Sequence, residues 1–193
     1  MPLKDVIEAL SGSKVINFNK SDEKDIKLLN NLIRAAKIVC MEINIKGILR
    51  ARANEVGNDI EQFVVRALKK VDYTAEIPKT KMGIRKITGY PDREFTDEFG
   101  RLNYLECKTF SIDNVLTTQR SFYLSPSEGF KVTKNAHHFI MSFEIYEVKR
   151  KGSKNLYKTK SWKIIDVADL LVDLKYEFNS DNLRLYSKNT ILA

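Results

Sequence analysis

The residues of this chain best suited to catalysis are an aspartate, Asp92, and a glutamate–lysine pair, Glu106 and Lys108. Alternate residues of a strand point to the same face, so Glu106 and Lys108 would share one face and Leu105 and Cys107 the other. The apolar pair can then enter the core. The charged pair would lie together on the opposite face of the sheet.

A short hairpin would bring Asp92 next to this pair. A three-residue loop over 98–100, with Gly100 in the left-handed conformation, is a favoured connection between antiparallel strands. In the register that this loop sets, Asp92 lies directly opposite Glu106, and cross-strand Cβ atoms are about 4.5–5.5 Å apart.

Two bare carboxylates at that distance repel each other, which predicts a divalent cation between Asp92 and Glu106. Hard oxygen ligands suit Mg²⁺. Lys108 beside the metal would orient water or stabilise charge that develops on a phosphate. The alternative is a solvated hairpin face with incidental acids, since Asp97 and Glu98 lie close by in the sequence.

These segments resemble the PD-(D/E)xK nuclease superfamily. Pro91-Asp92 matches the first half of its motif, and Glu106-Cys107-Lys108 matches the second. The family often has a further acid on a helix before the sheet, and the segment 57–64 resembles that helix, with Glu61 at the matching position. Glu61 lies about 90° from the centre of the helix's apolar stripe, on its rim, whereas Glu55 lies about 150° away. A plain surface glutamate is the other interpretation of Glu61.

The resemblance spans about residues 54–143 and implies Mg²⁺-dependent hydrolysis of phosphodiester bonds in double-stranded DNA. It implies an α/β fold with a central mixed β-sheet flanked by helices, a restriction-endonuclease-like core. The favoured member is a type II restriction endonuclease, which would act as a homodimer to cut both strands of a palindrome. The alternatives are a structure-selective nuclease of the Holliday junction resolvase type and a DNA-binding module without catalysis.

Basic and amide side chains after the motif are candidates for DNA contacts, because these types pair with base edges or neutralise phosphates. The candidates fall in the irregular stretch 111–135 and in a lysine-rich turn after 147. They are Gln119, Arg120, Lys134, Asn135, Lys149, Arg150 and Lys151. The alternatives are a loop that caps the sheet and a solvated turn.

The elements that must position these residues follow from hydrophobic periodicity. Helices are expected over 2–10, 24–44 with Ser21 as N-cap, and 54–70 with Asn54 as N-cap, with a short final helix near 167–174. Strands are expected over 73–78, 84–95, 102–110, 139–148 and 156–165, the last two joined by a turn at Gly152.

Composition agrees with this interpretation. The chain has 193 residues, enough for a single nuclease domain, divided into a helical extension (1–50), a catalytic core (54–148) and a basic hairpin with a C-terminal helix (149–193). Its net charge of +8 favours an anionic partner. Two cysteines and two histidines exclude a disulfide framework and a zinc ribbon. Without an apolar run of membrane-spanning length, we expect a soluble cytoplasmic protein.

Overall fold

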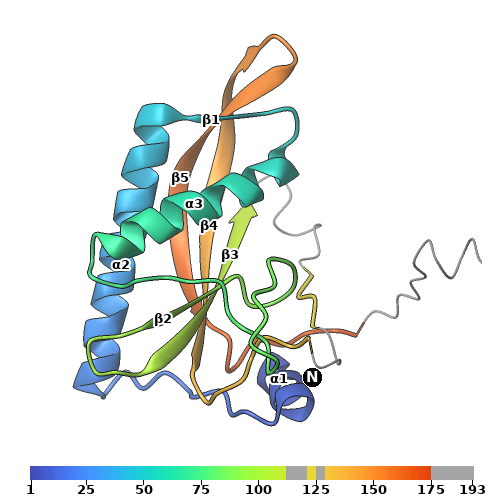
Figure 1. Ribbon diagram of the computed structural model, residues 1–193. Coiled ribbons are helices and arrows are strands. Elements are labelled where there is room, and N and C mark those ends of the chain that lie inside the picture. Colours follow the sequence, from blue (N-terminus) through green and yellow to red (C-terminus); the bar gives the residue numbers. More distant parts are fainter. Residues whose placement is uncertain (112–120, 125–128, 175–193) are drawn as a thin grey trace, which may run out of the picture.

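A curled five-stranded sheet forms the centre of the computed structural model, which describes residues 1–111, 121–124 and 129–174 (Figure 1). The strands lie in the order β1-β5-β4-β3-β2. β3 and β4 are parallel, and the other neighbours are antiparallel. This confirms the predicted α/β class with a mixed sheet. The bounds are β1 Ile48–Arg50, β2 Arg93–Thr96, β3 Leu102–Phe110, β4 His137–Lys151 and β5 Lys154–Asp166.

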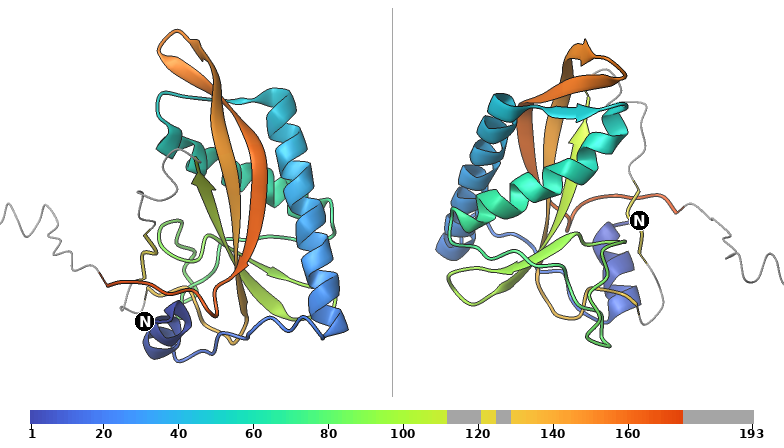
Figure 2. Two further views of the ribbon diagram at one scale, coloured as in Figure 1. Left: turned by 180° about the vertical axis from the view of Figure 1, so that it is seen from behind. Right: turned by 45° about the horizontal axis from the view of Figure 1, so that its top comes forward.

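Within the described ranges, three α-helices pack around the sheet: α1 (Leu3–Ser11), α2 (Glu23–Lys46) and α3 (Val56–Lys69). A 3-10 turn, Ala53–Glu55, leads into α3. α3 crosses one face of the sheet, and α2 runs along β5 (Figure 1). Seen from behind, α1 lies near the lower end of the sheet, and the β4–β5 hairpin extends beyond the other end (Figure 2). None of the helices described combines the length and apolar character needed to traverse a bilayer.

Apolar residues cover both faces of the sheet, which explains why β3 is buried along most of its length. The larger core contains Leu105 and Cys107 together with the apolar stripes of α2 and α3. The smaller core, on the other face, contains Tyr104, Ile140 and residues of α1. As expected from strand alternation, Leu105 and Cys107 are core residues, so Glu106 points to the opposite face.

The starts of α2 and α3 differ from the predictions. Asp22, not Ser21, is the N-cap of α2, and its carboxylate accepts hydrogen bonds from the backbone N–H groups of Lys24 and Asp25 at 2.7 and 3.2 Å. The charged aspartate side chain satisfies two free N–H groups of the first turn at once. Asn54 lies inside the 3-10 turn and therefore caps no helix.

The predicted strands before Asp92 are largely absent. Of the segments 73–78 and 84–95, only the end of the second, from Arg93 onward, joins a ladder as β2. Glu76 and Arg85 make isolated bridges, to Glu94 and Lys79. Gly83 and Gly89 have positive φ angles of 77° and 83°, which turn the chain before pairing can extend. The predicted strand β3 is confirmed to the residue, and β4 and β5 are longer than predicted because they continue to Gly152.

The prediction of a short final helix over residues 167–174 is wrong. This segment contains a turn and a bridge from Leu171 to Pro2 instead. Val167 and Ala168 are buried in the smaller core, so their apolar character reflects packing under α1 and not helical periodicity. Residues 175–193 lie outside the described part of the chain.

Candidate active site

The β2–β3 hairpin positions the predicted acids as the sequence suggested. Arg93 pairs with Leu105, and Gly100 has a φ of 75° in the loop. The backbone N–H of Asp97 donates to the carbonyl of Arg101 at 3.0 Å, which closes the three-residue loop. This is the predicted register. It places Asp92, immediately before β2, beside Glu106.

A backbone hydrogen bond fixes Asp92. Its Oδ2 accepts from the N–H of Cys107 at 2.8 Å, so the carboxylate is held against the middle of β3. Because Cys107 itself is a buried core residue, this donor is part of a rigid strand. The orientation of the Asp92 carboxylate is therefore set by the sheet.

Glu106 and Lys108 meet on the face opposite Cys107. Lys108 Nζ lies 2.5 Å from Glu106 Oε1. Glu106 is only 5% exposed, and its other oxygen, Oε2, has no hydrogen-bond partner within the described residues. A buried carboxylate oxygen without a donor is costly and calls for a cation or a proton.

The electrostatics indicate the same need. The pKa of Glu106 is raised to about 7 by burial and by the negative charge of Asp92, although Lys108 acts in the opposite direction. A buried carboxyl group whose pKa is raised by a neighbouring carboxylate is stabilised in its ionised form when a cation binds beside it.

The donor set fits a hard divalent cation. Asp92 and Glu106 offer carboxylate oxygens, one of them unpartnered. Within the ranges described, no group of three or more His, Cys, Asp or Glu side chains converges as a closed metal cage. Mg²⁺ is usually bound by one or two carboxylates and completes its shell with water and substrate phosphate. An open two-carboxylate site therefore suits Mg²⁺ better than a structural zinc.

Glu61 of α3 lies at the edge of this cluster. Its Oε2 accepts from the guanidinium of Arg93 at 3.0 Å, and Arg93 is buried. Burial raises the pKa of Glu61, and the charge of Asp92 adds to the effect. Glu55, the residue rejected on helical geometry, pairs with exposed Arg52 instead.

Comparisons with known proteins identify the family of this chain. A model of the type II restriction enzyme MjaV family matches residues 1–189. The type II restriction enzyme MjaV of Methanocaldococcus jannaschii is 39% identical over 201 residues, which covers 96% of this chain and 85% of that enzyme. This chain belongs to the MjaV family of type II restriction enzymes. The prediction of a type II restriction enzyme, made from the motif, is confirmed.

A solved structure is similar at a lower level. The tetrameric restriction endonuclease SfiI, determined with bound cognate DNA, is 14% identical, with a TM-score of 0.43. The match covers 84% of this chain and 65% of the SfiI chain, so this restriction enzyme spans just under two thirds of that protein's length.

Sequence reasoning missed one residue of the cluster, Lys131. It is only 1% exposed, and its Nζ has no hydrogen-bond partner in the described part of the chain. Burial lowers the pKa of Lys131, whereas the charges of Asp92 and Glu106 raise it. Lys131 lies in the irregular segment before β4, where no periodicity indicates which side chains face inward.

The predicted DNA contacts have varied surroundings. Gln119 and Arg120 lie outside the described residues. Lys149, Arg150 and Lys151 are exposed near the tip of the β4–β5 hairpin. Asn135 has a structural contact, because its Oδ1 accepts from the N–H of Lys14 at 2.7 Å. These assignments stay predictions.

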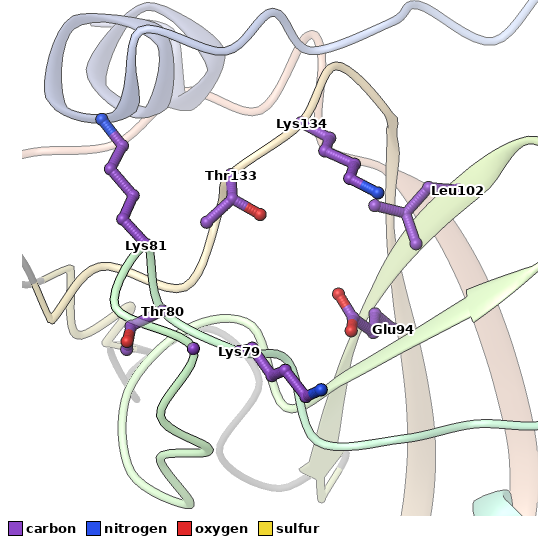
Figure 3. A pocket seen from close by; sticks show the side chains of 8 residues that line it. Lys79, Thr80, Lys81, Glu94, Leu102, Thr133 and Lys134 are labelled. Carbon is purple, nitrogen blue, oxygen red and sulfur yellow. The ribbon is translucent and has the colours of Figure 1, made fainter.

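Lys134 lines a cavity of about 440 Å³ on the far side of β2 from Arg93. Lys79, Lys81 and Glu94 also line it; Lys79 and Lys134 lie on the side of Glu94, and Lys81 lies on the opposite side of the hollow (Figure 3). Burial and the nearby Glu76 raise the pKa of Glu94, and Lys134 opposes that shift. With three lysines and one glutamate in its lining, this hollow has an excess of positive charge.

The raised pKa of Glu106 predicts a pH-dependent stability in metal-free buffer. Unfolded glutamate ionises near 4.5, whereas folded Glu106 keeps its proton to about 7. The folded state thus binds more protons in this window, and stability falls as pH rises from 4.5 to 7. Glu106→Gln removes the titration. We expect the free energy of unfolding of Glu106→Gln, relative to that of wild type, to increase between pH 4.5 and 7 and to stay constant above pH 7. Denaturant unfolding in EDTA measures it, and a constant difference across the window contradicts the assignment.

Proposed function

We propose that this restriction enzyme hydrolyses phosphodiester bonds at specific sites in double-stranded DNA, with Mg²⁺ held by Asp92 and Glu106. The observation that carries the proposal is the unpartnered Oε2 of buried Glu106 beside Asp92, with Lys108 bonded to the same carboxylate. When bound, Mg²⁺ supplies positive charge for the phosphate and acidifies a bound water.

Two groups of the protein hold the carboxylates in position. The N–H of Cys107 fixes the Asp92 carboxylate in one orientation, and Lys108 fixes the Glu106 carboxylate. The Lys108 side chain is 23% exposed, so it lies at the edge of the buried site, and its Nζ also donates to the carbonyl of Ser121 at 3.3 Å. There it would stabilise the negative charge that grows on the phosphate as water attacks in line with the departing 3′ oxygen.

Cleavage of both strands favours a homodimer. One site cuts one strand at a time, and a two-fold axis places two copies on the two strands of a palindrome. The lysines at the tip of the β4–β5 hairpin and around the Lys134 cavity would bind backbone phosphates on either side of the cut.

Incubation with plasmid and phage DNA, with and without Mg²⁺, tests the proposal. We expect discrete fragments with Mg²⁺ and intact DNA in EDTA. Cleavage confined to cruciform or branched DNA would replace the proposal with a resolvase. A mobility shift without cutting would replace it with a binding module. Sequencing of fragment ends then gives the recognition site and the stagger.

Glu61 is expected to make a smaller contribution than the motif acids. Its carboxylate is held by Arg93 and acts on Asp92 through charge. We expect Glu61→Gln to slow single-turnover cleavage about tenfold, the size of effect typical of groups that orient metal ligands. Glu55→Gln is the matched control on the same segment and should cut at the wild-type rate. Equal rates for both variants would remove Glu61 from the site.

A further inference from the structure

Lys131 is a buried cation that the proposed mechanism leaves without a task. It lies in the segment before β4 and not on the hairpin that carries the motif. Its side chain is almost completely buried, and Nζ makes neither a hydrogen bond nor an ion pair with the residues described. It is close enough to Asp92, Glu106 and Glu61 for their charges to act on it.

A buried ammonium without an acceptor is strongly unfavourable unless another group binds it. The nearby carboxylates attract the ammonium without bonding it, so the missing acceptor lies outside the side chains described. A metal ion cannot be the missing group, because two positive charges repel each other. An anionic oxygen can bind Mg²⁺ and can also accept a hydrogen bond from an ammonium. The phosphate of the substrate has such oxygens.

We propose that Lys131 binds a non-bridging oxygen of the scissile phosphate and is thus a second substrate-contacting ammonium of the site, besides Lys108. This inference rests on the proposed function, because it requires a phosphodiester at Asp92 and Glu106. It differs from the motif, which has a single lysine. The competing explanation is that Lys131 only offsets the charge of the three acids.

A double-mutant cycle on binding separates these explanations. Wild type and Lys131→Met are each titrated in EDTA with a duplex that carries the mapped cleavage site. The titrations are repeated with the scissile phosphate replaced by a neutral methylphosphonate. If Lys131 binds that phosphate, its ammonium and the phosphate charge contribute jointly, and we expect a coupling of fivefold or more in affinity. The control is Lys37→Met, on the exposed side of α2, for which we expect no coupling.

Cleavage and stability complete the test. We expect Lys131→Met to cut on the order of 100-fold more slowly in single-turnover reactions with Mg²⁺. Its Tm should be equal to or above that of wild type, because an apolar side chain replaces an unpaired buried charge. Lys131→Arg keeps the charge and should retain the coupling. A role limited to charge balance predicts a lower Tm and no coupling.

The outcomes distinguish the two proposals. An inactive Glu106→Gln together with a Lys131→Met that couples by less than twofold overturns the role of Lys131 alone. A Glu106→Gln enzyme that cuts normally overturns the proposed site, and a wild type that cuts no DNA overturns both.

Discussion

Loss of either motif acid is expected to abolish cleavage. Glu106→Gln keeps the shape of the side chain and removes the charge that would hold Mg²⁺. We expect the single-turnover rate to fall by on the order of 1,000-fold or more, well beyond the 10–100-fold typical of groups that only orient a ligand. Asp92→Asn should have the same effect, because an amide oxygen can still accept from the N–H of Cys107 while the negative charge is gone.

Lys108→Met tests the third member of the site. It removes the ammonium that lies 2.5 Å from Glu106, and we expect a comparable loss of cleavage. DNA binding should survive in the two acid variants and become tighter, since a carboxylate near a phosphate is repulsive. Filter binding in EDTA and single-turnover cleavage in Mg²⁺ measure the two effects separately. Glu23→Gln, an exposed acid at the start of α2, is the control. Wild-type cutting by any motif variant would mean that the site is elsewhere.

The arrangement of Asp92, Glu106 and Lys108 could be predicted because it depends on local geometry. Gly100 fixes the loop, the loop fixes the register, and the register places Asp92 beside Glu106. Strand alternation then assigns Leu105 and Cys107 to the core without any knowledge of what covers them. The apolar stripe of α3 was predictable for the same reason, since a helical period is a property of neighbouring residues.

Long-range packing determines the features that the sequence did not reveal. Lys131 is buried because its segment crosses the face of the sheet opposite α2 and α3, in a stretch without periodicity. The short strand β1 exists only because β5, more than 100 residues later, offers it an edge. Residues 73–92 alternate like strands, yet Gly83 and Gly89 turn the chain, so only isolated bridges form.

Arg101 is expected to be the main electrostatic anchor of the β2–β3 hairpin. Its Nη1 lies 2.6 Å from Asp25 at the start of α2, and its Nε lies 2.8 Å from Asp97 of the hairpin. The side chains of Asp25 and Asp97 are only 4% and 0% exposed. Asp97 also accepts the backbone N–H groups of Phe99 and Arg101, so it helps to close the loop that sets the register.

Arg101→Met would leave both buried carboxylates without their cation. Removal of one partner from a buried ion pair costs about 3–5 kcal/mol, and we expect the lower end because Arg101 is partly exposed. For a chain of this size, 3 kcal/mol lowers Tm by roughly 6–12 °C. Arg52→Met removes an exposed pair with Glu55 and should change the free energy of unfolding by less than about 1 kcal/mol.

The reason for the loss can be tested by removing an acid as well. If the unpaired charge of Asp25 causes the instability, Arg101→Met with Asp25→Asn should be more stable than Arg101→Met alone, because the neutral amide needs no cation. Asparagine can still accept from the N–H of Asn19, which bonds Asp25 at 2.8 Å. Denaturant unfolding at neutral pH measures the three free energies. A double variant no more stable than Arg101→Met would mean that Arg101 acts through packing, and that the hairpin keeps its register without this ion pair.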